Sequence, residues 1–238
     1  MSLPATLDGP WRFGPVTVWR RPHVPGQRGE PQARQVLAQA LGTDPQTLPL
    51  VRDDKGRPEL SGPLAHYGTG WSHSGEVLLV ALGEGVRLGV DLELLRPRPR
   101  LLEIVRRFFH PQEVAWLERL DEADREHWFF RVWCVKEAIL KAHGQGISFG
   151  LHRLQLAPGA DGALHLRWCD PELGEAARWH LHEWQASGQF RAALAHQIEQ
   201  FLREQVPEIK PITAHGQMAP SQVEERMSAF YDKHYDVL

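Results

Sequence analysis

The longest helical pattern in the chain, residues 126–143, lies between two groups of strand-like segments. Its apolar residues recur at helical spacing on one face, at Trp128, Val132, Val135, Ile139 and Ala142. The helix is expected to end at Gly144–Gly146, because glycine disfavours helix propagation. Since strands and helices are mixed without strict alternation, the pattern predicts an α+β fold.

Short segments rich in β-branched or aromatic residues surround this helix, separated by Gly, Pro or Asp. The expected strands cover 16–19, 77–82, 87–93, 154–157, 164–169, 179–185 and 190–194. The further expected helices cover 32–41, 101–109 and 112–120. Because only Gly83-Glu-Gly85 separates 77–82 from 87–93, these two strands are expected to form a hairpin.

The length of 238 residues is long for one typical domain and short for two. Arg96-Pro-Arg-Pro99 disfavours regular structure and is expected to link two α+β subdomains, residues 1–96 and 97–196. Residues 197–238 are expected to form a C-terminal extension. A capping box at Ser221–Glu224 predicts a helix near 221–234 that either packs on the body or binds a partner.

Composition excludes several classes of protein. No apolar run exceeds about six residues, so no membrane segment is expected. The net charge of −3 argues against a nucleic-acid-binding protein, and the two cysteines and the absence of a signal-like N-terminus favour the cytoplasm. Arginines nevertheless cluster in 1–34 and 94–107, which indicates either a solvated surface or sites for phosphates or an acidic partner.

Two segments carry acidic residues in a pattern that suits a cation. Alternation along the strand 87–93 places Asp91 and Glu93 on one face, where they repel each other unless a cation such as Mg²⁺ lies between them. In the long helix, Glu137 and Lys141 follow Trp133 at four-residue spacing and point away from the apolar stripe. The alternatives are a half-exposed strand and a surface ion pair.

Two histidine-containing segments allow other readings. Gly70–Gly75 is expected to be a turn in which Ser72 and His73 offer donors to an anion, or a simple turn before a strand. His180 and His182 share a strand face, but no third ligand follows at a characteristic spacing, so no metal site is expected there.

The order of these motifs resembles that of the surfactin-type (Sfp-type) 4′-phosphopantetheinyl transferases. That order is Gly-Arg-Pro (56–58), Trp-Ser-His-Ser-Gly (71–75), Gly-Val-Asp-Leu-Glu (89–93), Arg-Phe-Phe…Glu (107–113), Trp-x-x-Lys-Glu-Ala-x-x-Lys (133–141) and Gly-x-Gly-Ile-Ser (144–148). The resemblance covers roughly residues 50–195. It implies two similar α+β subdomains related by a pseudo-twofold, with coenzyme A and Mg²⁺ in the cleft between them.

The resemblance also implies an activity, that of a holo-[acyl-carrier-protein] synthase. Such an enzyme transfers 4′-phosphopantetheine from coenzyme A to a serine of an acyl, polyketide or peptidyl carrier protein and releases 3′,5′-ADP. The carrier is an acidic partner, which the arginines at 96–107 are expected to steer. A monomer is expected, because the fused halves build the cleft without a second chain.

Matching positions assign the site residues. The metal carboxylates implied are Asp91, Glu93 and Glu137, and Lys141 is implied to contact the phosphates. The implied coenzyme A contacts are Arg28, Arg57, Ser72 and His73, with His73 near the 3′-phosphate. One departure is Gln145, where the family usually carries Lys.

The base that deprotonates the carrier serine is left open among Glu137, Glu113 and a metal-bound water. Two other functions use the same residues. A Mg²⁺-dependent phosphodiesterase or nuclease would hydrolyse a diester without a carrier. A degenerate family member would bind coenzyme A or a carrier as a scaffold.

Overall fold

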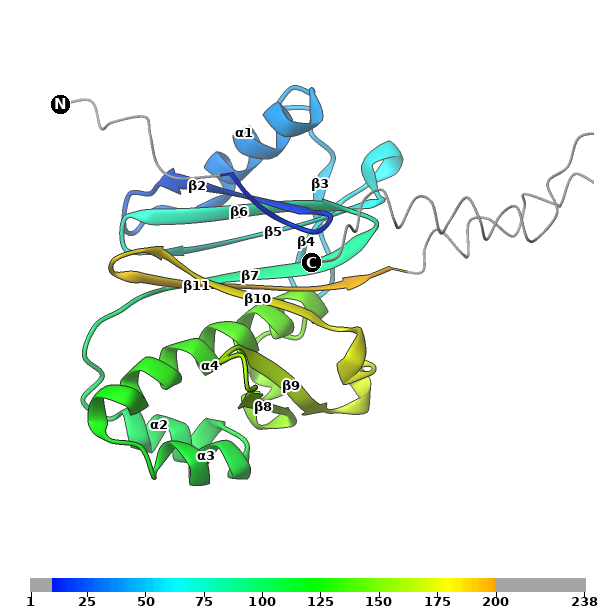
Figure 1. The fold of residues 1–238 in the computed structure, drawn as a ribbon. Coiled ribbons are helices and arrows are strands. Elements are labelled where there is room, and N and C mark those ends of the chain that lie inside the picture. The colour runs from blue at the N-terminus through cyan, green and yellow to red at the C-terminus, as the bar shows by residue number, and fades with distance from the viewer. Residues whose placement is uncertain (1–9, 200–238) are drawn as a thin grey trace, which may run out of the picture.

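The protein, seen as a computed structural model, is described over residues 10–199 (Figure 1). Its helices are α1 (Glu30–Leu41), α2 (Leu101–Phe108), α3 (Pro111–Leu117) and α4 (Glu122–His143). Its strands are β1 (Trp11–Phe13), β2 (Val16–Pro22), β3 (Leu50–Arg52), β4 (Pro58–Leu60), β5 (Tyr67–Ser74), β6 (Val77–Glu84), β7 (Val86–Leu94), β8 (Leu154–Pro158), β9 (Leu164–Cys169), β10 (His180–Ser187) and β11 (Phe190–Ile198). The expected α+β character is confirmed.

Two antiparallel sheets lie face to face between helices. One has the strand order β1-β2-β6-β5 and is covered by α1, whereas the other has the order β10-β11-β7 and is covered by α4 (Figure 1). Two short hairpins, β3-β4 and β8-β9, lie outside these sheets. The chain therefore forms four layers with three apolar cores between them.

Strand β6 explains how the first two cores are built. Leu78, Val80 and Leu82 pack with α1, while the residues that alternate with them, Val77, Leu79 and Ala81, pack against the second sheet. A strand covered on both faces needs a continuous apolar sequence, which is what residues 77–82 provide.

The hairpin expected between 77–82 and 87–93 is wrong. β6 pairs with β2 on one side and β5 on the other, so no edge of β6 is left for β7. The chain turns at Gly85 into the second sheet, where β7 pairs with β11 from Val86↔Ile198 to Leu94↔Phe190. The turn expected at Gly70–Gly75 is also wrong, because β5 continues through Ser74 and the chain turns only at Gly75.

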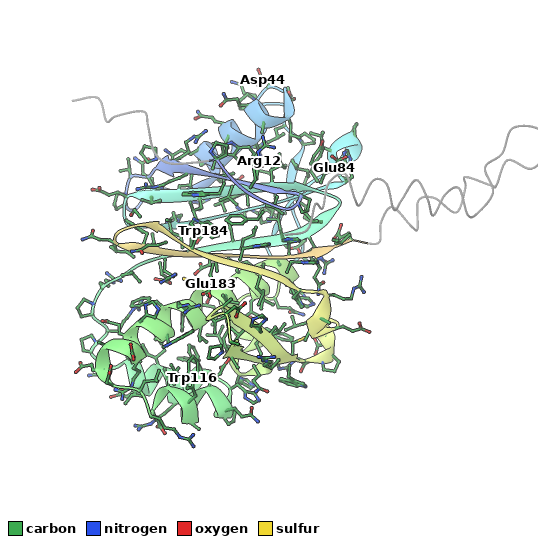
Figure 2. All side chains as sticks on the ribbon, viewed as in Figure 1. Arg12, Asp44, Glu84, Trp116, Glu183 and Trp184 are labelled. Atoms are coloured by element: carbon green, nitrogen blue, oxygen red, sulfur yellow. The ribbon has the colours of Figure 1, made fainter. Side chains whose placement is uncertain are left out.

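The second sheet joins distant parts of the chain. β7 precedes the Arg96–Pro99 segment, whereas its partner β11 lies near the end of the described chain. Adjacent residues of β10 show the two faces of this sheet (Figure 2): Trp184 packs on Trp11 and Phe13 of the first sheet, and Glu183 pairs with Arg131 of α4.

Helix α4 differs from the one-faced helix that the apolar stripe predicts. Consecutive residues from Cys134 to Leu140 are all buried, including Lys136 and Glu137. The reason is that β7 and β11 cover one side of the helix, while α2, α3 and the β8-β9 hairpin cover another (Figure 1). Two charged residues of α4 are therefore buried and need partners.

Two further expectations concern the membrane and the tail. Within residues 10–199, the helices are all too short or too polar to span a bilayer. The helix expected near 221–234 lies outside the described residues.

Candidate functional site

Gly89 of β7 allows α4 to approach the strand closely. A Cβ at this position would lie 2.2 Å from the Ala138 carbonyl oxygen and 2.3 Å from the Ala142 amide nitrogen. Any side chain here would push the helix away, since such contacts are shorter than van der Waals distance. Glycine thus lets Glu137 and Lys141 of α4 lie beside Asp91, two residues further along β7.

Three elements meet at Asp91. Lys141 Nζ of α4 lies 2.5 Å from Asp91 Oδ1, and it donates to Ser72 Oγ of β5 at 3.0 Å. Ser72 Oγ in turn donates to Asp91 Oδ1 at 3.1 Å. The Asp91 side chain is 5% exposed and that of Lys141 is 35% exposed, so the ammonium forms the accessible side of the cluster.

The electrostatics of Lys141 follow from these contacts. Burial lowers the pKa of Lys141, but the Asp91 and Glu137 carboxylates outweigh burial and raise this pKa above its usual value. The lysine is therefore a fixed cation at neutral pH. A cation at the accessible edge of a buried acidic cluster is suited to binding anionic oxygens.

Glu137 adds a second buried carboxylate. Burial and the neighbouring Asp91 raise the pKa of Glu137 to about 7. Glu137 Oε1 and Asp91 Oδ2 are both buried and accept no hydrogen bond from the described residues. Bare buried carboxylate oxygens are costly unless a cation satisfies them, and a pair of hard oxygen donors suits Mg²⁺. These two residues therefore fit a divalent cation.

Glu93 lies on the same face of β7 as Asp91, but it has different partners. Its Oε2 lies 3.3 Å from Arg98 Nη2. Burial and the Asp91 charge raise the pKa of Glu93. Over residues 10–199, no three His, Cys, Asp or Glu side chains converge as a metal-binding group. Asp91 and Glu137 are thus a pair, with Glu93 turned to Arg98.

A groove of about 400 Å³ opens next to Lys141, between the β3–β4 turn and the end of α4. Its cationic lining residues are Arg52, Lys55, Arg57 and Lys141. Gly144 (φ +86°) lets the β3–β4 turn pack here, since a Cβ would lie 3.2 Å from Asp53 Oδ2. Four cations around one groove favour a polyanionic ligand.

The aromatic wall of the groove comes from Trp71 of β5, with the Arg52 guanidinium 5.4 Å from its ring centroid. The neighbouring His73 stacks on buried His23 at a centroid distance of 4.3 Å. Burial, His23 and Lys141 lower the pKa of His73. Arg28 precedes Gly29, the N-cap of α1, and a Cβ at Gly29 would lie 3.3 Å from His73 Cδ2.

Glu113 is not part of this cluster. Its Oε2 lies 2.6 Å from Lys136 Nζ and accepts from the His110 amide at 3.0 Å, while Oε1 accepts from the Leu156 amide at 2.7 Å. Both the Glu113 and Lys136 side chains are 0% exposed. A carboxylate with all its oxygens engaged and no accessible surface is a structural group.

Sequence reasoning missed some of these residues. Arg52 and Lys55 flank the same turn as Arg57, and that shared turn was the available signal. Arg98 was grouped with the arginines around it, and nothing in the local sequence sets it apart. Lys136 is part of the motif at 133–141, but its buried position was missed, because the sequence does not reveal that α4 is covered on more than one side.

Comparisons with known proteins agree with this geometry. Residues 87–195 match the model of the 4′-phosphopantetheinyl transferase superfamily. A Synechocystis protein assigned by name to these transferases is 37% identical over 62% of this chain and 59% of its own length. The Bacillus subtilis 4′-phosphopantetheinyl transferase Sfp is 27% identical over 60% of this chain and 62% of its own. The chain thus spans about three fifths of the length of these curated relatives.

Among solved structures, the crystal structure of holo-ACP-synthase from Plasmodium yoelii aligns with 49% of this chain and 98% of its own, at 17% identity and a TM-score of 0.35.

Proposed function

We propose that this chain, whose residues 87–195 match the 4′-phosphopantetheinyl transferase superfamily, transfers 4′-phosphopantetheine from coenzyme A to a carrier-protein serine, releasing 3′,5′-ADP. The observation that carries the proposal is the buried cluster at Asp91. Two bare carboxylate oxygens lie there beside a lysine, at the end of a cationic groove. Transfer from a pyrophosphate needs both cation binding and anion binding at one point.

Asp91 and Glu137 would hold Mg²⁺ through Asp91 Oδ2 and Glu137 Oε1, the oxygens without hydrogen-bond donors. When bound, Mg²⁺ would offset the charge that develops on the pyrophosphate as its phosphorus–oxygen bond breaks. Glu93, the third acidic residue of the expected set, pairs with Arg98 instead.

The phosphates of coenzyme A are proposed to lie in the groove. Lys141 donates to Asp91 and Ser72, which orient its ammonium at the inner end of the groove. Arg57 extends along the wall and pairs with Glu59 at 2.9 Å. These cations would neutralise the leaving phosphates, and His73 and Arg28, near Trp71, would bind the nucleotide end.

The carrier serine must lose a proton as it attacks. Glu137 is the residue we propose for this step, through its other oxygen, Oε2, because Oε1 would hold the cation and the carboxylate lies in the same cluster as Lys141. Glu113 is not proposed, because its oxygens are engaged by Lys136 and by backbone amides.

The organisation of the whole chain is also proposed. Residues 1–96 and 97–196 would be two similar α+β subdomains related by a pseudo-twofold, with 197–238 as an extension. A helix on the outer face of each sheet, α1 and α4, supports two similar halves, although β7 of the first half pairs with β11 of the second. One chain supplies every residue of the cluster, so we propose a monomer. The two free, buried cysteines fit the reducing cytoplasm.

The test is the mass of a carrier protein. The full chain is incubated with coenzyme A, Mg²⁺ and an apo carrier, and the carrier is weighed by mass spectrometry. We expect a gain of one phosphopantetheine and an equal amount of 3′,5′-ADP. Asp91→Asn should slow the gain by about 10²–10³-fold, whereas Asp161→Asn, which changes an exposed carboxylate in the β8–β9 turn, should leave it unchanged. Unmodified acyl and peptidyl carriers, or diester hydrolysis without a carrier, would contradict the proposal.

A further inference from the structure

We propose that Arg98 is a positioning residue that holds Glu93 away from the divalent cation, leaving Asp91 and Glu137 as the only protein carboxylates that bind it. The inference rests on the proposed function and concerns how its metal site is completed. It starts from an asymmetry: Asp91 and Glu137 each have a bare buried oxygen, whereas Glu93 is engaged by a guanidinium.

The ion pair is well placed to compete with a metal. Arg98 Nη2 lies 3.3 Å from Glu93 Oε2, and the two side chains are only 28% and 20% exposed. The guanidinium carbon also lies 5.7 Å from the ring centroid of Phe130 in α4. Limited exposure reduces solvent screening, so this pair is stronger than an ordinary surface pair.

The backbone around Arg98 fixes the position from which the side chain extends. Pro97 and Pro99 flank it, and their rings restrict the backbone on both sides. The Arg98 carbonyl accepts from the Leu101 amide at 3.0 Å, which ties this segment to the start of α2. A residue held in this way loses little chain entropy on forming the ion pair.

The neighbouring arginines provide matched controls. Arg96 and Arg100 belong to the same basic segment but are exposed, whereas Arg98 is half-buried. Replacing any one of these three arginines by a neutral residue would reduce the positive charge near the site by one. Only removal of Arg98 would also free Glu93. Arg191, which pairs in register with Glu93 across β7 and β11, stays in every variant as a second cation.

A guanidinium and a divalent cation cannot share the same face of Glu93, because their like charges repel. Freeing Glu93 therefore adds a third carboxylate to the site, and the affinity of such sites increases with the number of charged ligands. Part of any gain would come simply from losing a nearby positive charge. That part does not depend on Glu93, so a double variant separates the two causes.

The experiment measures Mn²⁺ binding to the full chain by calorimetry and by the paramagnetic resonance of free Mn²⁺, without coenzyme A or carrier. Arg98→Gln should tighten binding about tenfold. Glu93→Gln alone should change the Kd less than about twofold, and the Arg98→Gln/Glu93→Gln double variant should return to the wild-type value. Arg96→Gln and Arg100→Gln should also stay within about twofold of wild type.

Three results would overturn the inference. If Glu93→Gln weakened Mn²⁺ binding as strongly as Asp91→Asn, Glu93 would already be a ligand of the cation. A gain in Arg98→Gln that persists in the double variant would assign it to charge alone, and an unchanged Kd in Arg98→Gln would mean that the ion pair does not compete. In each of these cases the cation still depends on Asp91, so the proposed function stands. If the wild type itself binds no Mn²⁺, both proposals fail.

Discussion

Two lysines of helix α4 pair with carboxylates, Lys136 with Glu113 and Lys141 with Asp91. The pairs differ in whether every carboxylate oxygen has a hydrogen-bond donor. In the Lys136–Glu113 pair, every charged oxygen has a donor, and Lys136 Nζ also donates to the carbonyls of Leu151 and Leu154 at 2.7 and 2.6 Å. In the Lys141–Asp91 pair, Asp91 Oδ2 and the nearby Glu137 Oε1 have no donor. The first pair is complete among the described residues, whereas the second has carboxylate oxygens that a bound cation would satisfy.

The two lysine–carboxylate pairs also differ in their solvent accessibility. Lys136 and Glu113 are wholly enclosed, whereas Lys141 faces the groove lined by Arg52 and Arg57. Burial of charge alone therefore does not identify a functional site in this protein. What marks the proposed site is a carboxylate that lacks a hydrogen-bond donor and lies next to accessible space.

The largest expected effect is on stability at the complete pair. Lys136→Met removes the charged partner with which buried Glu113 pairs at 2.6 Å and should lower the free energy of unfolding by about 3–5 kcal/mol. The double variant Lys136→Met/Glu113→Gln should recover most of this loss, because no unpaired charge remains. Urea denaturation measures both variants. Transfer per folded molecule should be retained, and its loss in the stable double variant would place this pair in the reaction.

The opposite result is expected at the incomplete pair. Asp91→Asn should reduce the rate of carrier modification by about 10²–10³-fold, because cation binding and the orientation of Lys141 are both lost. The melting temperature should change little or rise, since one of two repelling carboxylates becomes neutral. Initial rates and thermal unfolding of the same sample test this. A large fall in melting temperature with a normal rate would reverse the two roles.

His196 tests whether an unpartnered buried atom is sufficient to indicate function. It is 2% exposed, its Nδ1 has no partner among the described residues, and it stacks on His180 and His182. It pairs in register with Leu88, whereas Asp91 pairs with Ala193. Burial, and then His180 and His182, lower the pKa of His196 to about 3. The imidazole is neutral in the folded protein but titrates at the ordinary value when unfolded.

Because the unfolded chain binds this proton first, stability is full above about pH 6.5 and falls as the pH drops toward 3, by about 1.4 kcal/mol per pH unit. His196→Gln should reduce that slope and leave transfer at neutral pH unchanged. Denaturation at several pH values measures the slope. An unchanged slope, or lost transfer, would contradict this assignment.

The smallest effect is expected in the groove. Arg57 already pairs with Glu59, so Arg57→Gln should raise the KM for coenzyme A about tenfold with little change in kcat. Arg12→Gln, an exposed change on β1, is the control. Steady-state kinetics measures both. Equal changes in the two variants would mean that the groove does not hold the phosphates.

Local sequence patterns predicted much of the fold. Helix ends were found where glycine takes a positive φ, at Gly42 and Gly144, and where Pro111 starts a helix. Alternation along β7 placed Asp91 and Glu93 on one face, in agreement with the structure. Pairing between distant segments was not predictable in this way. β6 pairs with β2 and β5 rather than with β7, and neither the turn at Gly85 nor any local spacing encodes that choice.

Contacts within the site were likewise not predictable from local sequence. That β7 and α4 meet was implied by the family resemblance, while the physical reason, the absence of a side chain at Gly89, appears only once the two elements are in contact. The partner of His182 is similar: His196 pairs in register with His180 and lies diagonally across from His182, with the two Nε2 atoms 3.4 Å apart, through a strand pairing that no linear motif describes. Partners that arrive through tertiary packing leave no local signal.

The central claim is that the incomplete pair binds a cation and the complete pair does not. Anomalous X-ray scattering from a crystal of the full chain grown with Mn²⁺ tests it directly. We predict one strong peak in contact with Asp91 Oδ2 and Glu137 Oε1, and none at Glu113 or Lys136. A crystal that contains Mn²⁺ elsewhere but shows no peak at Asp91 and Glu137 would contradict the account.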